Sequence, residues 1–147
     1  MSIEINHLEH VYNAGTPFEH SALHGIDLSI PEGKGTAIIG QTGSGKSTLF
    51  LCLNGIRRPD SGEIRIGGKP IEYTRRGLMD VRRRVGVVFQ EPDNQLFSAS
   101  VYQEISFGIL NLGIPEEEAA KEVERVMDRL GIARFRHKPT HALSGGQ

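Results

Sequence analysis

The stretch GQTGSGKST, residues 40–48, matches the phosphate-loop pattern G-x-x-x-x-G-K-[ST] in full and is the strongest indication of the fold. The run before it, GTAIIG at residues 35–40, is apolar and predicts a short strand buried on both faces. A helix-compatible run follows the loop, and Gly55 can end it. A strand, a glycine loop and a helix in this order are the context that confirms a phosphate loop.

The residue types of this loop suit a phosphate ligand. Its glycines let the backbone turn tightly and bring N–H groups around an anion, and the helix N-terminus adds its positive dipole end. Lys46 supplies a full charge to the β- and γ-phosphates, Ser47 can offer its hydroxyl to Mg²⁺, and Thr48 can reach the α-phosphate. A glycine turn without a ligand would leave Lys46 unexplained. The predicted ATP-binding residues are Gly40, Gln41, Thr42, Gly43, Ser44, Gly45, Lys46, Ser47 and Thr48.

Hydrophobic periodicity places further elements on both sides of the loop. Alternating patterns predict strands over residues 3–12 and 22–30 and a short strand over 63–66. A short helix and an apolar strand over 85–89 come before Gln90. The sequence therefore predicts an α/β core from which a helical subdomain emerges after Gln90.

The clearest helix is predicted over residues 116–130. Pro115 suits a first helical turn, and the three glutamates that follow it complement the helix dipole. The apolar residues expected on its inner face are Ala119, Val123, Val126, Met127 and Leu130.

Composition excludes several classes of protein. The 147 residues are 37% hydrophobic and carry a formal net charge of −1, which argues against a dedicated nucleic-acid binder. The single cysteine, Cys52, cannot form an internal disulfide and is expected as a small buried hydrophobe on a helix. No apolar run approaches the roughly 20 residues of a membrane span, so we expect a soluble chain that reaches a membrane through a partner. Six histidines without metal-ligand spacing are expected at the surface: His7, His10, His20, His24, His137 and His141.

Two further motifs bear on nucleotide chemistry. Gln90 ends the apolar strand, where a glutamine can touch a metal or position water near phosphates, or can simply mark the strand end. In LSGGQ, residues 143–147, Ser144 is a good N-cap, and Gly145 and Gly146 leave backbone N–H groups uncovered. This predicts a second anion site that faces a partner's nucleotide, although an ordinary helix start has the same residues.

With residues 40–48, Gln90 and 143–147 in this order, the chain resembles the nucleotide-binding domain of ABC transporters over its whole length. The resemblance implies an α/β fold, a P-loop NTPase core of ABC ATPase type with an N-terminal antiparallel β subdomain and a helical subdomain. One such domain would span residues 1–147, with the β subdomain and P-loop core in 1–90 and the Q-loop and helical subdomain in 91–147.

The resemblance also implies roles for single residues. Tyr12 matches the aromatic residue that stacks on adenine, or is only a strand packing residue. Gln90 matches the Q-loop, which implies a catalytic role for it. The resemblance also implies that Gln90 and Ser47 contact Mg²⁺. The family's metal-binding aspartate and catalytic glutamate follow the signature and are not among these residues, so we expect a truncated piece that is inactive alone. The residues expected to contact ATP on a partner subunit are Ser144, Gly145, Gly146 and Gln147.

Residues 12–23 and 87–108 resemble the ATPases of energy-coupling factor (ECF) transporters, and GTPFE resembles the second of their two paralogous ATPases. This implies a subunit that couples ATP binding and hydrolysis to uptake of a vitamin or a transition-metal ion. It would act peripherally on the cytoplasmic face of the cell membrane. Its partners would be a second ABC ATPase subunit, a transmembrane coupling subunit and a substrate-binding membrane subunit, with no nucleic acid.

Two alternatives stay open for the function. The chain could serve another ABC transporter, or it could be the head of a nucleic-acid-associated ABC ATPase. The second is disfavoured because only about fifty residues separate Gln90 from Leu143, without sustained heptads. A ribosome-binding ABC protein would show two domains and a basic helical arm, and neither is visible.

Leu96 and Phe97 form an apolar pair in a turn-prone, polar segment. Such a pair marks an interface if it is exposed, or it tucks into the helical subdomain. The resemblance favours the interface, because ABC ATPases receive a coupling helix of their membrane subunit beside the Q-loop.

Overall fold

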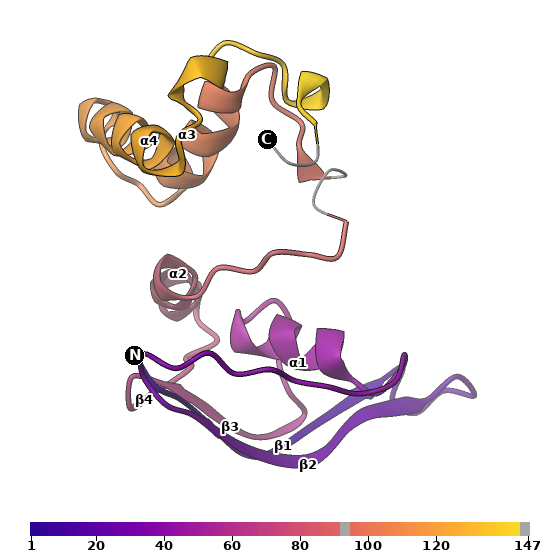
Figure 1. The fold of residues 1–147 in the computed structure, drawn as a ribbon. Coiled ribbons are helices and arrows are strands. Elements are labelled where there is room, and N and C mark those ends of the chain that lie inside the picture. Colours follow the sequence, from indigo (N-terminus) through magenta and orange to yellow (C-terminus); the bar gives the residue numbers. More distant parts are fainter. Residues whose placement is uncertain (92–94, 145–147) are drawn as a thin grey trace. The chain divides into compact units, whose positions relative to one another are not determined.

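The computed structural model describes residues 1–91 and 95–144. The chain divides into two compact units, Met1–Val87 and Val88–Gln147, and each has its own hydrophobic cluster. Figure 1 shows the first unit from indigo to magenta and the second in orange and yellow. Each unit is described by itself.

The first unit is built on a four-stranded antiparallel sheet with the strand order β2-β1-β3-β4 (Figure 1). The strands are β1 (Ile3–Tyr12), β2 (His20–Ile30), β3 (Ser61–Ile66) and β4 (Lys69–Pro70). The first three confirm the strands that alternation predicts, and the sheet confirms the N-terminal antiparallel β subdomain.

The central strand β1 changes its inward face at His7. Ile5 is buried before this residue, whereas Leu8 and His10 are buried after it. His7 has φ 47, and the register against β3 shifts between Asn6 and Glu9. Its N–H donates to Oδ1 of Asp27 at 2.7 Å. Because side chains alternate along a strand, this bulge places Tyr12 on the same side as Leu8 and His10.

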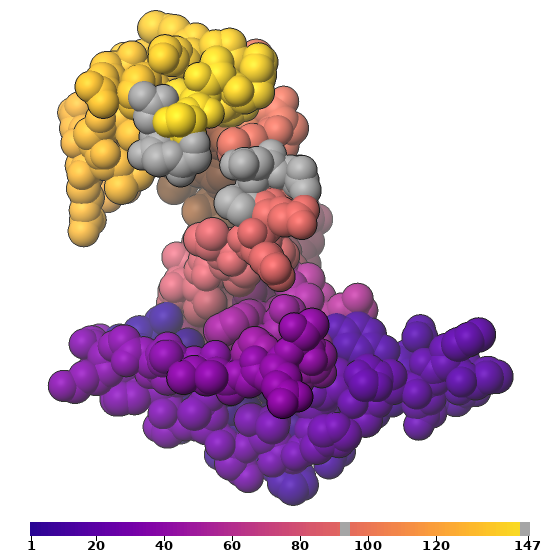
Figure 2. Space-filling model, turned by 45° about the vertical axis from the view of Figure 1, so that its right-hand side comes forward, coloured from indigo at the N-terminus to yellow at the C-terminus, as the bar shows by residue number. Residues whose placement is uncertain are grey.

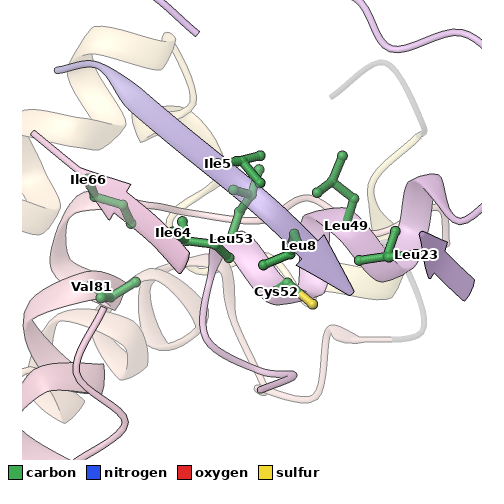
Figure 3. Packing of buried hydrophobic residues seen from close by; sticks show 9 residues of the cluster. All are labelled: Ile5, Leu8, Leu23, Leu49, Cys52, Leu53, Ile64, Ile66 and Val81. Atoms are coloured by element: carbon green, nitrogen blue, oxygen red, sulfur yellow. The ribbon is translucent and has the colours of Figure 1, made fainter. Parts of the chain in front are cut away.

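Two helices complete the first unit, α1 (Lys46–Leu53) and α2 (Arg75–Arg84). Figure 3 shows side chains of β1, β3 and α1 that gather into one core. Cys52 is fully buried on α1, as expected from sequence. The buried members of this core are Ile5, Leu8, Leu23, Leu49, Cys52, Leu53, Ile64, Ile66 and Val81.

The two apolar strands predicted over residues 35–40 and 85–89 are wrong as secondary structure, because neither segment is a strand in the structure. Ile39 is 93% exposed and Val88 is 88% exposed. An apolar run makes a segment suitable for a buried strand, but a strand also needs a neighbouring strand that pairs with its backbone. Among the described residues no strand pairs with either segment. Most of residues 31–44 are exposed, and purple atoms of this region spread over the surface in Figure 2.

The second unit is helical. It contains α3 (Val101–Asn111), α4 (Glu116–Leu130) and two short 3-10 helices, Ala133–Phe135 and Thr140–Ala142. The hydroxyl of Ser100 caps α3 by accepting from the N–H of Gln103 at 3.3 Å. In the part of the chain that the structure describes, no helix is long and apolar enough to cross a membrane.

Helix α4 confirms the helix predicted over the same residues, with one exception on its inner face. Ala119, Val123 and Met127 are buried and Val126 is half-buried, but Leu130 is 64% exposed. Leu130 is the last helical residue, and the chain turns at Gly131, which has φ 67. The packed stripe therefore ends at Met127, and the prediction for Leu130 is wrong.

Candidate nucleotide-binding site

The phosphate loop leads directly into α1. Gly45 is the N-cap with φ 86, and its carbonyl accepts the N–H of Leu49 at 2.9 Å. The first turn of α1 contains no acidic residue. A helix N-terminus carries N–H groups without intrahelical partners and the positive end of the helix dipole. The start of α1 is therefore electrostatically suited to an anion.

Two glycines of this loop occupy places where a larger residue would collide. A Cβ on Gly45 would lie 2.3 Å from the carbonyl oxygen of Ala22 on β2. A Cβ on Gly40 would lie 2.5 Å from Oγ of Ser44 across the loop. The missing side chains thus let the loop curl on itself and press against the sheet.

The loop curls around the ammonium group of Lys46. The Nζ atom donates to the carbonyl oxygens of Gly40 and Gln41, each at 2.7 Å, and to Oγ of Ser44 at 3.2 Å. The structure thus brings the predicted lysine and the predicted loop backbone together at the start of one helix. A fixed cation beside a helix N-terminus provides the charge-assisted contacts that phosphate oxygens accept.

Tyr12 reaches the phosphate loop from β1. Its hydroxyl lies 3.1 Å from Oγ1 of Thr48, and Thr48 is 7% exposed. The guanidinium carbon of Arg57 lies 5.1 Å from the centroid of the Tyr12 ring. Ser47, between Lys46 and Thr48, is exposed. The sequence assigned Tyr12 and Thr48 to one ligand, but the hydrogen bond between them and the stacked Arg57 were not predicted.

His10 contradicts the expectation that every histidine is at the surface, because it is only 7% exposed. Its ring meets that of Tyr12 edge to face, with centroids 4.8 Å apart. Its Nδ1 lies 2.9 Å from Oδ2 of Asp60, without hydrogen-bond geometry. The same Oδ2 accepts the N–H of Val11 at 2.8 Å. His10 and Asp60 therefore stabilise the end of β1 that carries Tyr12. No sequence pattern predicted this role, because the bulge at His7 decides which side chains of β1 point inward. The other five histidines are exposed as predicted.

Two of the predicted motifs belong to the second unit. Gln90 is exposed. Ser144 is exposed too, whereas Gly145, Gly146 and Gln147 lie outside the described residues. No group of three acidic, histidine or cysteine side chains among the described residues could hold a metal ion.

Leu96 and Phe97 are both exposed, at 43% and 66%. The Phe97 ring meets Phe107 of α3 edge to face, with centroids 4.8 Å apart. The carboxylate Oε2 of Glu104 accepts the backbone N–H groups of Phe97 and Ser98 at 3.2 and 2.8 Å. Glu104 thus anchors the backbone of this segment to α3 while the apolar pair faces solvent.

Known proteins resemble the chain in sequence. Residues 23–147 match the family model described as ABC transporter. The chain is 50% identical over 145 residues to the energy-coupling factor transporter ATP-binding protein EcfA2 of Clostridium perfringens, covering 99% of this chain and 50% of that protein. It is 50% identical over 126 residues to the cobalt import ATP-binding protein CbiO of Rhodobacter capsulatus, covering 86% and 45%. The chain spans about half the length of the curated relatives it matches.

Solved structures resemble it in fold. The structure of cbiO1 from Clostridium perfringens, part of the ABC transporter complex cbiONQ, has a TM-score of 0.82 at 50% identity and covers 99% of this chain and 56% of that one. The dimeric ATP-binding cassette MJ0796, bound to ADP and phosphate after hydrolysis, has a TM-score of 0.80 at 26% identity, covering 99% and 64%.

Proposed function

Because the chain belongs to the ABC transporter family, we propose that it is the ATP-binding part of an ECF-type importer. ATP binding and hydrolysis by the whole protein would drive uptake of a vitamin or a transition-metal ion. The observation that carries the proposal is the enclosure of Lys46 Nζ by the loop at the start of α1. The names of the relatives support the importer class.

The residues present fit ATP with Mg²⁺. The glycines have no side chains that would keep the loop backbone away from a phosphate, and Lys46 supplies a fixed positive charge. Ser47 is exposed, so its hydroxyl is available to a metal ion. When bound, ATP supplies the phosphoanhydride bond that is hydrolysed, and Mg²⁺ neutralises its phosphate charge. The protein's part is to exchange the three loop contacts of Lys46 for phosphate oxygens and to present the Tyr12 ring to adenine.

The proposal gives the remaining motifs their roles. Residues 1–90 and 91–147 act as the core with its β subdomain and as the helical subdomain of one nucleotide-binding domain. Gln90 and Ser47 would together hold Mg²⁺ in the nucleotide-bound protein. The residues that would contact ATP held on a second subunit are Ser144, Gly145, Gly146 and Gln147.

The partners follow from the importer class. The full-length protein would pair with a second ABC ATPase subunit and would dock on a transmembrane coupling subunit at the cytoplasmic face of the membrane. A separate membrane subunit would bind the solute. The relatives named as ECF and cobalt import ATP-binding proteins, and the structure described as part of a cbiONQ complex, support this assembly.

The test uses Lys46→Ala in the full-length protein, with Lys34→Ala as the matched control. Lys34 is exposed, lies shortly before the loop and makes no contact with a described residue that involves its charge. The loss of the fixed counter-charge should weaken MgATP binding by about tenfold or more in isothermal titration calorimetry, and Lys34→Ala should leave it unchanged. Normal MgATP affinity and normal ATP-dependent uptake in Lys46→Ala would refute the site. Intact ATP binding without co-purifying ECF membrane subunits would favour another ABC transporter.

A further inference from the structure

Helix α2 is unusually basic. Five of its ten residues are arginines and only one is acidic. A cavity of about 890 Å³ lies along this helix and β4, in the size range of small-molecule sites. None of the residues 40–48 lines it, so it is distinct from the phosphate loop. The cationic residues that line it are Lys69, Arg75, Arg76, Arg83 and Arg84.

The acidic residues of this cavity do not balance its cations. Asp80 forms an ion pair with Arg84, whose Nη2 lies 2.6 Å from Oδ2 of Asp80. Nη1 of Arg84 donates to the carbonyl oxygen of Ile66 at 3.1 Å. Glu72 makes no ion pair with a described residue. With Arg84 paired to Asp80 and Arg83 left out of the count, three cations, Lys69, Arg75 and Arg76, remain against the single carboxylate of Glu72. The cavity therefore keeps a net positive charge, and an anion is the complementary ligand.

Two of these cations stand where a helix disfavours them. Arg75 and Arg76 begin α2, and neither forms an ion pair with a described residue. The positive end of the helix dipole repels cations in the first turn, and α2 has no acidic residue there to offset this. An anion bound between the two guanidinium groups would relieve the repulsion.

The frame of the cavity is fixed by close packing. A Cβ on Gly77 would lie 2.3 Å from the carbonyl oxygen of Glu72, so the first turn of α2 presses directly on the segment before it. The hydroxyl of Thr74 accepts the N–H of Gly77 at 3.0 Å and caps the helix. Val81, which is 2% exposed, anchors α2 to the core of the first unit. Arg75 and Arg76 therefore project from a held backbone.

We propose that this cavity binds a phosphate-bearing anion, with the guanidinium groups of Arg75 and Arg76 as its main contacts. A guanidinium group presents a planar fork of donors that matches two phosphate oxygens, which a lone ammonium cannot do. The phosphate belongs to a soluble polyphosphate or to the headgroup of an anionic phospholipid. The site stands independently of the proposed transport function, because its residues lie outside the nucleotide site.

The experiment uses the full-length protein with Lys46→Ala, so that the phosphate loop does not obscure the result. Pyrophosphate is titrated by calorimetry, and pelleting is measured with phosphatidylcholine vesicles with and without phosphatidylglycerol. The double change Arg75→Gln and Arg76→Gln should weaken one of these interactions by about tenfold or more. Arg82→Gln, on the same helix but outside the cavity, should change it less than about twofold.

The two probes separate the sources of the phosphate. Loss of pyrophosphate binding supports a soluble ligand, and loss of vesicle binding alone supports a lipid headgroup. Changing both Arg75 and Arg76 to lysine conserves the charge but removes the planar fork of donors. If that fork matters, this variant should bind the probe more weakly than the parent protein does. It also keeps the test valid if the glutamine variant does not fold. The proposal is wrong if neither probe binds, or if Arg82→Gln weakens binding as much as the double change.

Discussion

The hydroxyl of Tyr12 lies 3.1 Å from Oγ1 of Thr48, which ties the end of β1 to the first turn of α1. Thr48 is nearly buried, so this hydrogen bond satisfies a hydroxyl that water cannot easily reach. The same Tyr12 ring lies under Arg57 and against His10. The hydroxyl and the ring of Tyr12 therefore have separable roles, one in holding the loop and one in presenting an aromatic surface.

Tyr12→Phe removes the hydroxyl and keeps the ring. It should lower the free energy of unfolding by about 0.5–1.5 kcal/mol, because Thr48 loses its partner, and should change ATP affinity by less than about threefold. Tyr12→Ala should weaken ATP binding by about tenfold because the stacking surface is lost. Denaturant unfolding and ATP titration of both variants measure this, and equal ATP affinities for them would show that the ring does not contact the base.

Gly45→Ala should disrupt the phosphate loop. The new Cβ would lie 2.3 Å from the carbonyl oxygen of Ala22, so the loop must leave the sheet and nucleotide binding should be lost. Gly33→Ala is the matched control, because Gly33 also has a positive φ but has open space around it. Its cost should be limited to backbone strain, on the order of 1 kcal/mol, with ATP binding retained. Similar ATP affinities for the two variants would contradict the close approach.

Cys52 should react slowly with thiol reagents in the folded protein. Burial raises the pKa of its thiol from 9.0 to about 11, so the thiolate fraction at pH 8 falls by about 100-fold. Because the folded thiol keeps a proton that the unfolded thiol loses above pH 9, the free energy of unfolding should decrease as the pH rises from about 9 to 11. Reaction with DTNB at pH 8, with and without urea, tests the first statement, and equal rates would show that Cys52 is accessible.

Met127→Ala should destabilise the second unit by about 2–5 kcal/mol, because Met127 is fully buried among α3 and α4. Leu130→Ala should cost less than about 0.5 kcal/mol, because that side chain is largely exposed. Hydrogen exchange of the amides of α4 compares the two. Equal loss of amide protection in the two variants would show that Leu130 does belong to the packed face.

Phe97→Asp should impair assembly with a membrane subunit while ATP binding stays intact. The ring is 66% exposed and rests on Phe107, so a charge there should disturb an apolar contact with a partner more than it disturbs the fold. Leu130→Asp, at another exposed apolar position of the same unit, is the control and should assemble normally. Co-purification from cells that express the full-length protein decides it. Normal assembly, or unfolding of the Phe97 variant, would count against docking at this pair.

The elements that depend only on neighbours along the chain could be predicted from the sequence. The phosphate loop was predictable because its glycines, Lys46 and the following helix form one continuous segment whose geometry is local. Helix α4 was predictable because Pro115, three glutamates and a regular apolar stripe all favour a helix. The local geometry of the loop sets which residues surround the Lys46 ammonium group.

Tertiary structure decided what depends on residues distant in the chain. The segments 35–40 and 85–89 have apolar sequences suited to strands, but strand formation also needs a paired neighbour. Strict alternation along β1 would have turned Val11 inward, whereas the bulge at His7 turns Tyr12 toward Thr48. The extra residue of a bulge reverses the facing of the strand residues after it, and the pattern of side chains alone does not reveal where such a bulge stands.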